Sequence, residues 1–154
     1  MHTDEEKYKR CVEDIGELLQ KAVRTFQQLE RVHIKSHGFT SSQCHVLLEL
    51  HKNHTLSINA ISEKMKLEIS TVTRIMNNLV RDGLVVRQKS RQDKRIVEAS
   101  LTEQGVAAAD ELQYSIEHYY RDVIEHLPRG HVREVMRAVE HLVTALEKAN
   151  PKEN

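Results

Sequence analysis

The sequence predicts a mainly α-helical protein with one small β-hairpin, and three observations lead to this prediction. Only 5 Gly and 2 Pro occur in 154 residues, so long stretches contain no helix breaker. Apolar residues recur at spacings of three and four along most of the chain, which is the periodicity of amphipathic helices. One segment, from about Leu84 to Leu101, instead alternates apolar and polar residues around the polar loop "SRQD", as a hairpin does.

The first predicted element is a long helix from about Asp4 to Lys35. Its apolar residues, which include Tyr8, Val12 and Phe26, alternate spacings of four and three, as in a helix that buries one stripe against a neighbour. Gly38 marks the end of this helix, because glycine readily adopts the left-handed conformation that closes many helices.

Three shorter helices are expected between residues 40 and 83. Thr40 or Ser41 caps the first of them, Ser57 the second and Ser70 the third, because hydroxyl side chains accept hydrogen bonds from the free N–H groups at a helix start. The third helix ends at Asp82-Gly83. Its inward-facing residues are expected to be Ile69, Val72, Met76 and Leu79.

The remaining elements are two strands and two helices. The strands are expected at about 84–89 and 95–101, where they pair around the "SRQD" loop. Thr102 then opens another long helix, and Pro128 or a neighbour starts the last one, because proline is well suited to a first helical turn. The expected order is four helices, a hairpin and two helices.

Charge is distributed unevenly although the formal net charge is zero. Between Ser70 and Arg95 there are seven basic residues and only two acidic ones, Asp82 and Asp93, so the rest of the chain is acidic overall. An acidic body with one basic segment is typical of a protein that presents a single surface to a polyanion. The basic residues are Arg74, Arg81, Arg87, Lys89, Arg91, Lys94 and Arg95.

Two short helices joined by a tight turn and followed by a basic hairpin predict a winged helix-turn-helix that binds double-stranded DNA. A helix fits the major groove, where Arg pairs with guanine, Asn pairs with adenine, and Ser or Thr reaches either base edges or thymine methyl groups. The basic hairpin would reach phosphates or an adjacent minor groove. The expected DNA-contacting residues are Ser70, Thr71, Thr73, Arg74, Asn77 and Arg81 on the helix and Lys89, Arg91, Lys94 and Arg95 on the hairpin.

Several of these segments also carry a resemblance to a known family. The stretches "TSSQCHVLLEL", "STVTRIMNNLVRDGLVVR" and "QDKRIVEASLTEQG", together with the flanking long helices, resemble the MarR family of bacterial transcriptional regulators over about residues 8–148. The resemblance implies that Asp93 orients Arg95, the arginine that reaches toward the minor groove. It further implies a cytoplasmic homodimer that represses transcription at a palindromic operator, in which two recognition helices lie about one DNA turn apart.

The resemblance implies three regions within one integrated fold. Residues 1–38 form an N-terminal dimerisation helix, residues 39–101 the winged helix-turn-helix, and residues 102–154 the C-terminal dimerisation helices. The apolar stripes of the terminal helices suit a partner chain, although burial within one chain remains an alternative. Members of the family commonly release DNA when they bind a small phenolic or other anion, so a small-molecule effector is expected.

Two other kinds of sensor site are candidates. His33, Cys44 and His45 are residue types that bind Zn²⁺, and the resemblance places them near ligand positions of zinc-responsive family members. Histidines at the surface or edge of the core are the alternative. Cys11 is the candidate redox residue, since peroxide-sensing relatives carry a reactive cysteine in the first helix, although the matching position here is about Gly16. A structural or merely exposed thiol is the alternative.

Other functional classes find less support in the sequence. It contains no Gly-rich phosphate loop, no Gly-x-Ser-x-Gly elbow and no His-Glu-x-x-His motif, so an enzyme is not expected. No apolar run approaches the ~18 residues of a membrane span, and two cysteines without a CxxC pair are typical of a reducing cytosol. The main alternative is a winged-helix protein–protein adaptor that binds no operator.

Overall fold

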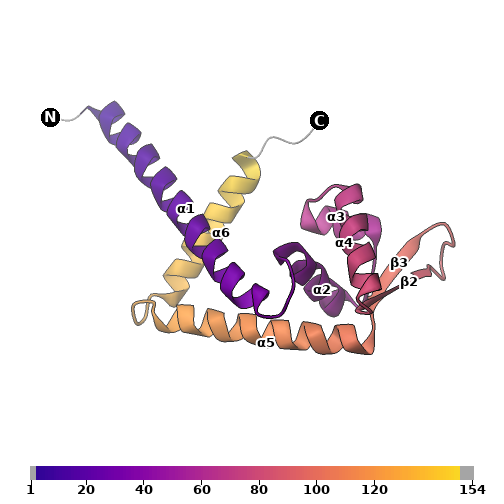
Figure 1. Ribbon diagram of the computed structural model, residues 1–154. Coiled ribbons are helices and arrows are strands. Elements are labelled where there is room, and N and C mark those ends of the chain that lie inside the picture. Colours follow the sequence, from indigo (N-terminus) through magenta and orange to yellow (C-terminus); the bar gives the residue numbers. More distant parts are fainter. Residues whose placement is uncertain (1–2, 150–154) are drawn as a thin grey trace. The chain divides into compact units, whose positions relative to one another are not determined.

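The computed structural model describes residues 3–149 and confirms a mainly helical chain with a small sheet and a winged helix-turn-helix (Figure 1). The elements in chain order are α1 (Asp4–Lys35), α2 (Ser41–Asn53), β1 (Thr55–Ser57), α3 (Ile58–Met65), α4 (Ile69–Arg81), β2 (Val85–Lys89), β3 (Val97–Leu101), α5 (Glu103–Glu125) and α6 (Val132–Ala149). The chain divides into two compact units, the first ending at Tyr114 and the second beginning at Ser115.

Side-chain caps begin the first three helices. Thr3 and Glu6 form a capping box at α1, and Thr40 and Gln43 form a second one at α2. Each box satisfies two free N–H groups, one through the hydroxyl oxygen and one through the acidic or amide side chain. The Ser57 hydroxyl accepts a hydrogen bond from the Ala60 N–H at the start of α3, so the caps expected at Thr40 and Ser57 are confirmed, and the cap at Thr3 is an addition that was not predicted from the sequence.

The predicted cap of α4 is wrong. Ser70 lies inside the helix, whose N-cap is Glu68, and no side chain caps this end. The cause is the shortness of the turn after α3, which Lys66 closes in the left-handed conformation with a φ of 51°. The chain therefore re-enters helical geometry at Ile69, and the Val72 N–H donates to the Glu68 carbonyl to complete the first turn of α4.

The sheet has a third strand that sequence patterning missed. Its order is β1-β3-β2, with both pairings antiparallel. Thr55 pairs with Ser100 and Ser57 with Glu98, so this three-residue strand is held by partners more than forty positions away. The hairpin strands form as expected, although β3 begins at Val97 and not at residue 95.

The core of the first unit lies between α2, α3, α4 and the base of the hairpin. Its fully buried side chains include Leu47, Leu50, Ile61, Met76 and Leu79. Burying each large aliphatic side chain contributes roughly 1.5–3 kcal/mol, so this cluster holds the helix-turn-helix against the sheet.

The inward face of α4 differs from the prediction at two positions. Val72, Met76 and Leu79 are buried as expected, and Ile75 joins them. Ile69, which was expected to face inward, is 53% exposed because it occupies the first helical position, beyond the edge of the core.

The last helix begins at Val132, four residues after the predicted start at Pro128. Gly130 has a φ of 84°, which is incompatible with an α-helix, and the His131 N–H donates to the Pro128 carbonyl to close a separate turn. His131 then precedes α6, where the Val135 N–H donates to its carbonyl oxygen.

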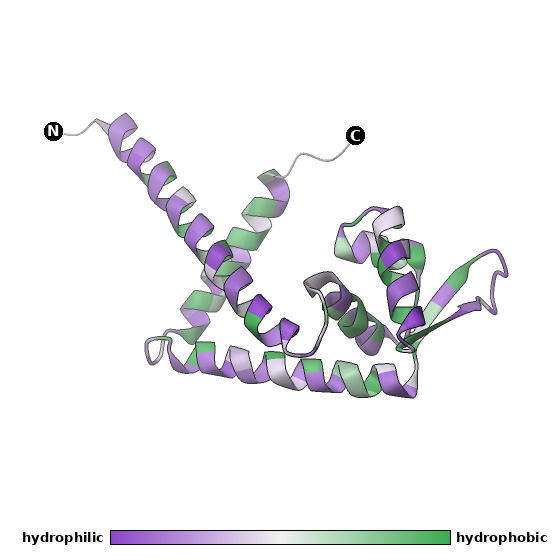
Figure 2. Cartoon of the chain, in the orientation of Figure 1, coloured by the Kyte–Doolittle hydropathy of each residue, from purple (hydrophilic) through white to green (hydrophobic). Residues whose placement is uncertain are grey.

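The apolar stripes of α1 and α6 remain exposed in the single chain. Tyr8, Val12 and Ile15 on α1 are 72%, 51% and 50% exposed, and Met136 and Val139 on α6 are 57% and 50% exposed. No residue that the structure describes in α6 is buried, and Figure 2 shows hydrophobic residues recurring along this helix. Large apolar side chains that are exposed along one helix, as on α1 and separately on α6, are typical of interaction sites.

Candidate DNA-binding surface

Helix α4 presents a polar face opposite its buried stripe. Ser70, Arg74, Asn77 and Arg81 are all exposed, and their spacing of four, three and four places them in one line along the helix. We call these four residues the recognition face. Arginine, asparagine and serine side chains are the donors and acceptors that read base edges in a major groove.

Two further predicted contacts, Thr71 and Thr73, lie on the flanks of this face and are half-buried. The Thr73 hydroxyl donates to the Ile69 carbonyl at 2.8 Å, so its proton is already engaged within the helix. The Arg81 Nε lies 3.1 Å from an Asp82 carboxylate oxygen, which partly neutralises this arginine at the C-terminal end of the helix.

The turn between α3 and α4 sets the direction of the recognition face. The Leu67 N–H donates to the Ser62 carbonyl at 3.1 Å, and the Ser62 hydroxyl donates to the Leu67 carbonyl at 2.5 Å. These reciprocal bonds connect the end of α3 to the entry of α4. Ile61 and Met76, which are fully buried, then pack the two helices into the core.

The loop of the hairpin holds Arg95 in a defined orientation. One Asp93 carboxylate oxygen accepts hydrogen bonds from the Arg95 backbone N–H at 3.0 Å and from Nε at 3.2 Å, and the other accepts from Nη2 at 3.2 Å. Hydrogen bonds from the Arg95 side chain and backbone lower the pKa of Asp93 below its usual value. The arginine side chain is nevertheless 91% exposed, so Asp93 directs it into solvent.

The rest of the hairpin loop is built around Ser90, which is buried. Its N–H donates to the Ile96 carbonyl at 2.9 Å, and the Ile96 N–H donates to the Asp93 carbonyl at 2.9 Å. Lys89, Arg91 and Lys94 are exposed around this framework. Figure 2 shows that the hairpin loop is hydrophilic, and we call it, with its two strands, the wing.

Arg87 is a basic residue that the predicted set of DNA contacts omitted. It lies on β2 opposite Ala99, and its Nη2 donates to the Thr73 carbonyl of α4 at 3.4 Å. The alternation of side chains along β2 could have indicated this contact with α4. Arg87 lies two residues after the buried Val85 and therefore on the same face of the strand, although its own side chain is exposed.

The predicted zinc ligands come only partly together. The Cys44 side chain is fully buried, and His45 Nε2 lies 3.3 Å from Glu30 Oε1, while His33 belongs to the last turn of α1. Among the residues that the structure describes, no three His, Cys, Asp or Glu side chains are grouped so that they would hold a metal ion. Burial and, secondarily, the Glu30 charge raise the pKa of Cys44 to about 11, which disfavours the thiolate that binds zinc. Zinc binding stays a prediction.

The predicted redox residue, Cys11, is an exposed free thiol on α1, and Cys44 is a buried free thiol. Exposure makes Cys11 accessible to oxidants, which is one requirement for a sensor. Its role also stays a prediction.

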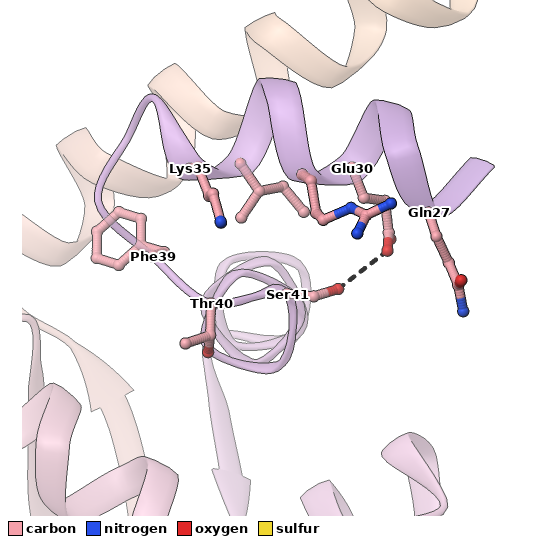
Figure 3. A pocket seen from close by; sticks show the side chains of 8 residues that line it. Gln27, Glu30, Lys35, Phe39, Thr40 and Ser41 are labelled. Atoms are coloured by element: carbon pink, nitrogen blue, oxygen red, sulfur yellow. Dashed lines mark hydrogen bonds between the residues drawn. The ribbon is translucent and has the colours of Figure 1, made fainter. Parts of the chain in front are cut away.

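A cavity of about 500 Å³ lies where α1 ends and α2 begins (Figure 3). The Ser41 hydroxyl donates to a Glu30 carboxylate oxygen at 3.1 Å across this junction. Ile34 and Phe39 provide apolar surface, whereas Arg31 and Lys35 provide positive charge. The lining residues are Gln27, Glu30, Arg31, Ile34, Lys35, Phe39, Thr40 and Ser41.

No helix in residues 3–149 combines the length and the apolar character needed to cross a membrane.

Comparison with known proteins connects this surface to a family. Residues 39–97 match the sequence model of the MarR family. The chain is 29% identical over 96 residues to the HTH-type transcriptional repressor MdtR of Bacillus subtilis, and the match covers 62% of this chain and 62% of that protein. The chain thus spans somewhat less than two thirds of this curated relative.

Solved structures show the same fold. A MarR family protein from Bacillus stearothermophilus superposes with a TM-score of 0.78 at 23% identity, over 90% of this chain and 97% of that one. A mutant MarR from E. coli complexed with operator DNA superposes with a TM-score of 0.72 at 18% identity, over 84% of this chain and 93% of that one.

Proposed function

Because this chain belongs to the MarR family of transcriptional regulators, we propose that it is a homodimeric repressor that binds a palindromic DNA operator. The family consists of regulators and not of enzymes, so the prediction that the chain is no enzyme is confirmed. The observation that carries the proposal is the pairing of the recognition face with a wing whose Arg95 is held outward by Asp93.

The two parts of this surface suit two features of one duplex. Helix α4 fits into a major groove with its recognition face toward the bases, where Arg74 and Asn77 contact base edges. The wing then follows the sugar–phosphate backbone, and Arg95 reaches the adjacent minor groove. Sequence preference would come mainly from α4, and salt-dependent affinity mainly from the wing.

Homodimerisation is supported by the exposed apolar stripes of α1 and α6. Side chains such as Tyr8, Val12 and Val139 are at least half exposed in one chain, and a second copy would remove them from water. A two-fold axis through such an interface places two recognition helices on one side of the duplex and makes the operator palindromic. Occupancy of a promoter by this dimer would then block transcription.

A small organic anion is the effector that the cavity between α1 and α2 suits. Ile34 and Phe39 would contact an aromatic ring, and Arg31 and Lys35 would attract its charge. Binding would bias the arrangement of α1 relative to α2, which is the first helix of the DNA-binding region. Thermal shift with a panel of hydroxybenzoates tests this part, and Lys35→Ala should reduce any shift.

The experiment that tests the function is a selection of genomic DNA fragments by the purified protein near physiological salt, followed by sequencing. We expect enrichment of a palindromic site of about two DNA turns. Arg74→Ala should relax base preference within each half-site. Arg95→Ala should weaken binding and alter the preference for A·T base pairs in the minor groove next to each half-site. Arg129, which is exposed in the turn between α5 and α6, supplies a charge-matched control in Arg129→Ala.

Each alternative has its own signature in this selection. Absence of any enriched sequence, with and without added zinc, would favour the protein–protein adaptor. Enrichment of a DNA sequence only when zinc is present would instead support His33, Cys44 and His45 as zinc ligands. Unchanged binding of both arginine variants would refute the placement of the DNA contacts on α4 and the wing.

A further inference from the structure

Arg87 joins the two elements to which the DNA contacts are assigned. It lies on β2, the first strand of the wing, and its Nη2 donates to the backbone carbonyl of Thr73, the fifth residue of α4, at 3.4 Å. Thr73 lies one residue before Arg74 of the recognition face. A single side chain therefore connects the strand of the wing to the recognition helix.

The chemistry of this contact leaves Arg87 free to bind something else. A carbonyl oxygen has two lone pairs, so the Thr73 carbonyl can accept from Arg87 in addition to its bond within the helix. A guanidinium group has five N–H donors, of which this contact uses one, and the Arg87 side chain is exposed. Planar, forked donors of this kind match the oxygens of a phosphate.

The strand register keeps a neighbouring acid away from this group. Arg87 pairs with Ala99, which is fully buried, whereas Glu98 pairs with Gln88. Because successive side chains of a strand point to opposite faces, Glu98 lies on the other face of the sheet from Arg87. Lys89, the next residue on the Arg87 face, adds a second positive charge.

The position of Arg87 defines which phosphate it would meet. If α4 occupies a major groove and the wing reaches the adjacent minor groove, one sugar–phosphate strand runs between them. We propose that Arg87 binds a phosphate of this strand while it remains bonded to the Thr73 carbonyl. The bridge fixes the position of the wing relative to the recognition helix, so that base reading and backbone binding keep one register. This inference rests on the proposed DNA-binding function.

Replacement of single phosphates by neutral methylphosphonates tests the bridge. The probe is the duplex recovered by the genomic selection, with one phosphate neutralised at a time across a half-site. We expect wild-type affinity to fall at a phosphate between the bases read by α4 and the minor groove beside the wing. In Arg87→Ala, which removes the guanidinium, the same replacement should have no further effect, while sensitivity at the other contacted phosphates persists.

Affinity and its salt dependence give a second readout. A lost hydrogen bond to a charged group corresponds to at least about tenfold in affinity for Arg87→Ala. A dimer that loses two phosphate contacts should show a slope of log affinity against log salt that is shallower by about 1.8. Arg87→Lys keeps the charge but lacks the fork, so we expect the slope to persist while affinity falls severalfold. Arg129→Ala controls for the removal of one positive charge.

Three results would overturn the inference. An Arg87→Ala protein with the wild-type pattern of methylphosphonate sensitivity would show that Arg87 meets no phosphate. An Arg87→Lys protein with wild-type affinity would show that a plain charge suffices and that the bridge to α4 has no role. If Arg87→Ala does not fold, the lysine variant still decides this second point. A wild-type protein that binds no duplex overturns both this inference and the proposed function, whereas the first two results leave the function intact.

Discussion

Gly105 is the position at which a single added methyl group should do most damage. It is the third residue of α5, where it is buried against the start of the hairpin. A Cβ on this residue would overlap the carbonyl oxygen of Leu84 and lie 2.9 Å from the carbonyl carbon of the same residue. That carbonyl also accepts a hydrogen bond from the Thr102 N–H at 3.0 Å, so it has little freedom to move away.

The magnitude for Gly105→Ala follows from two opposing effects. Alanine normally stabilises a helix interior by ~1 kcal/mol relative to glycine. Overpacking a tight site costs about 1–3 kcal/mol, and the upper end applies here because the obstructing atoms are backbone atoms and not a flexible side chain. The expected net loss of stability is about 2 kcal/mol, which corresponds to a fall in Tm of about 4–8 °C for a chain of this size.

The assay is thermal or urea unfolding at one fixed protein concentration, because dimerisation would make Tm depend on concentration. Gly16→Ala in α1 is the matched control, since a Cβ there would meet no heavy atom within 4 Å. That variant should gain roughly 0.5–1 kcal/mol. A Gly105→Ala protein that is as stable as the wild type would refute the close packing of α5 against Leu84.

Three further predictions concern a cap, the thiols and the wing. Thr102→Ala should cost about 1–2 kcal/mol in unfolding experiments, because the hydroxyl accepts from the Gly105 N–H and donates to the Gly83 carbonyl; an unchanged midpoint would contradict this. A thiol reagent at neutral pH should label Cys11 rapidly and Cys44 only on unfolding, because Cys44 is buried with a pKa raised to about 11; equal rates would refute its burial. NMR titration should find the pKa of Asp93 below its ordinary value in the wild type and higher in Arg95→Ala. Because the pKa is lowered, the bond between Asp93 and Arg95 is present at neutral pH and is lost only as pH falls through that pKa. An identical Asp93 pKa in both proteins would exclude the ion pair as the cause.

Local patterns accounted for most of the fold. The caps at Thr40 and Ser57, the apolar spacing of the helices and the alternation of the hairpin depend on neighbours within a few positions. Such interactions can be read from a sequence because the backbone geometry of a helix or hairpin is nearly invariant. The turn that holds Arg95 against Asp93 belongs to the same class, since the two residues are two positions apart.

Errors in the prediction arose where distant segments decide the outcome. Strand β1 is only three residues long and exists because β3 pairs with it. Ile69 has the spacing of a core residue, yet it lies beyond the end of the packed surface and is exposed. The wrong cap at Ser70 has a local cause instead, because the left-handed Lys66 shortens the preceding turn and α4 begins at Ile69 with Glu68 as its N-cap.

The candidate site divides along the same line. The residue types of α4 and the wing are evident from the amino-acid order, and they predict one basic, hydrogen-bonding surface that is available to DNA. The packing of the folded chain was needed to show that Arg87 reaches the Thr73 carbonyl, that Glu30 contacts both Ser41 and His45, and that Cys44 is buried. The three contacts join residues that are 11 to 15 positions apart, so they depend on how helices and strands pack against one another. The periodicity of side chains within one helix or strand does not specify that packing.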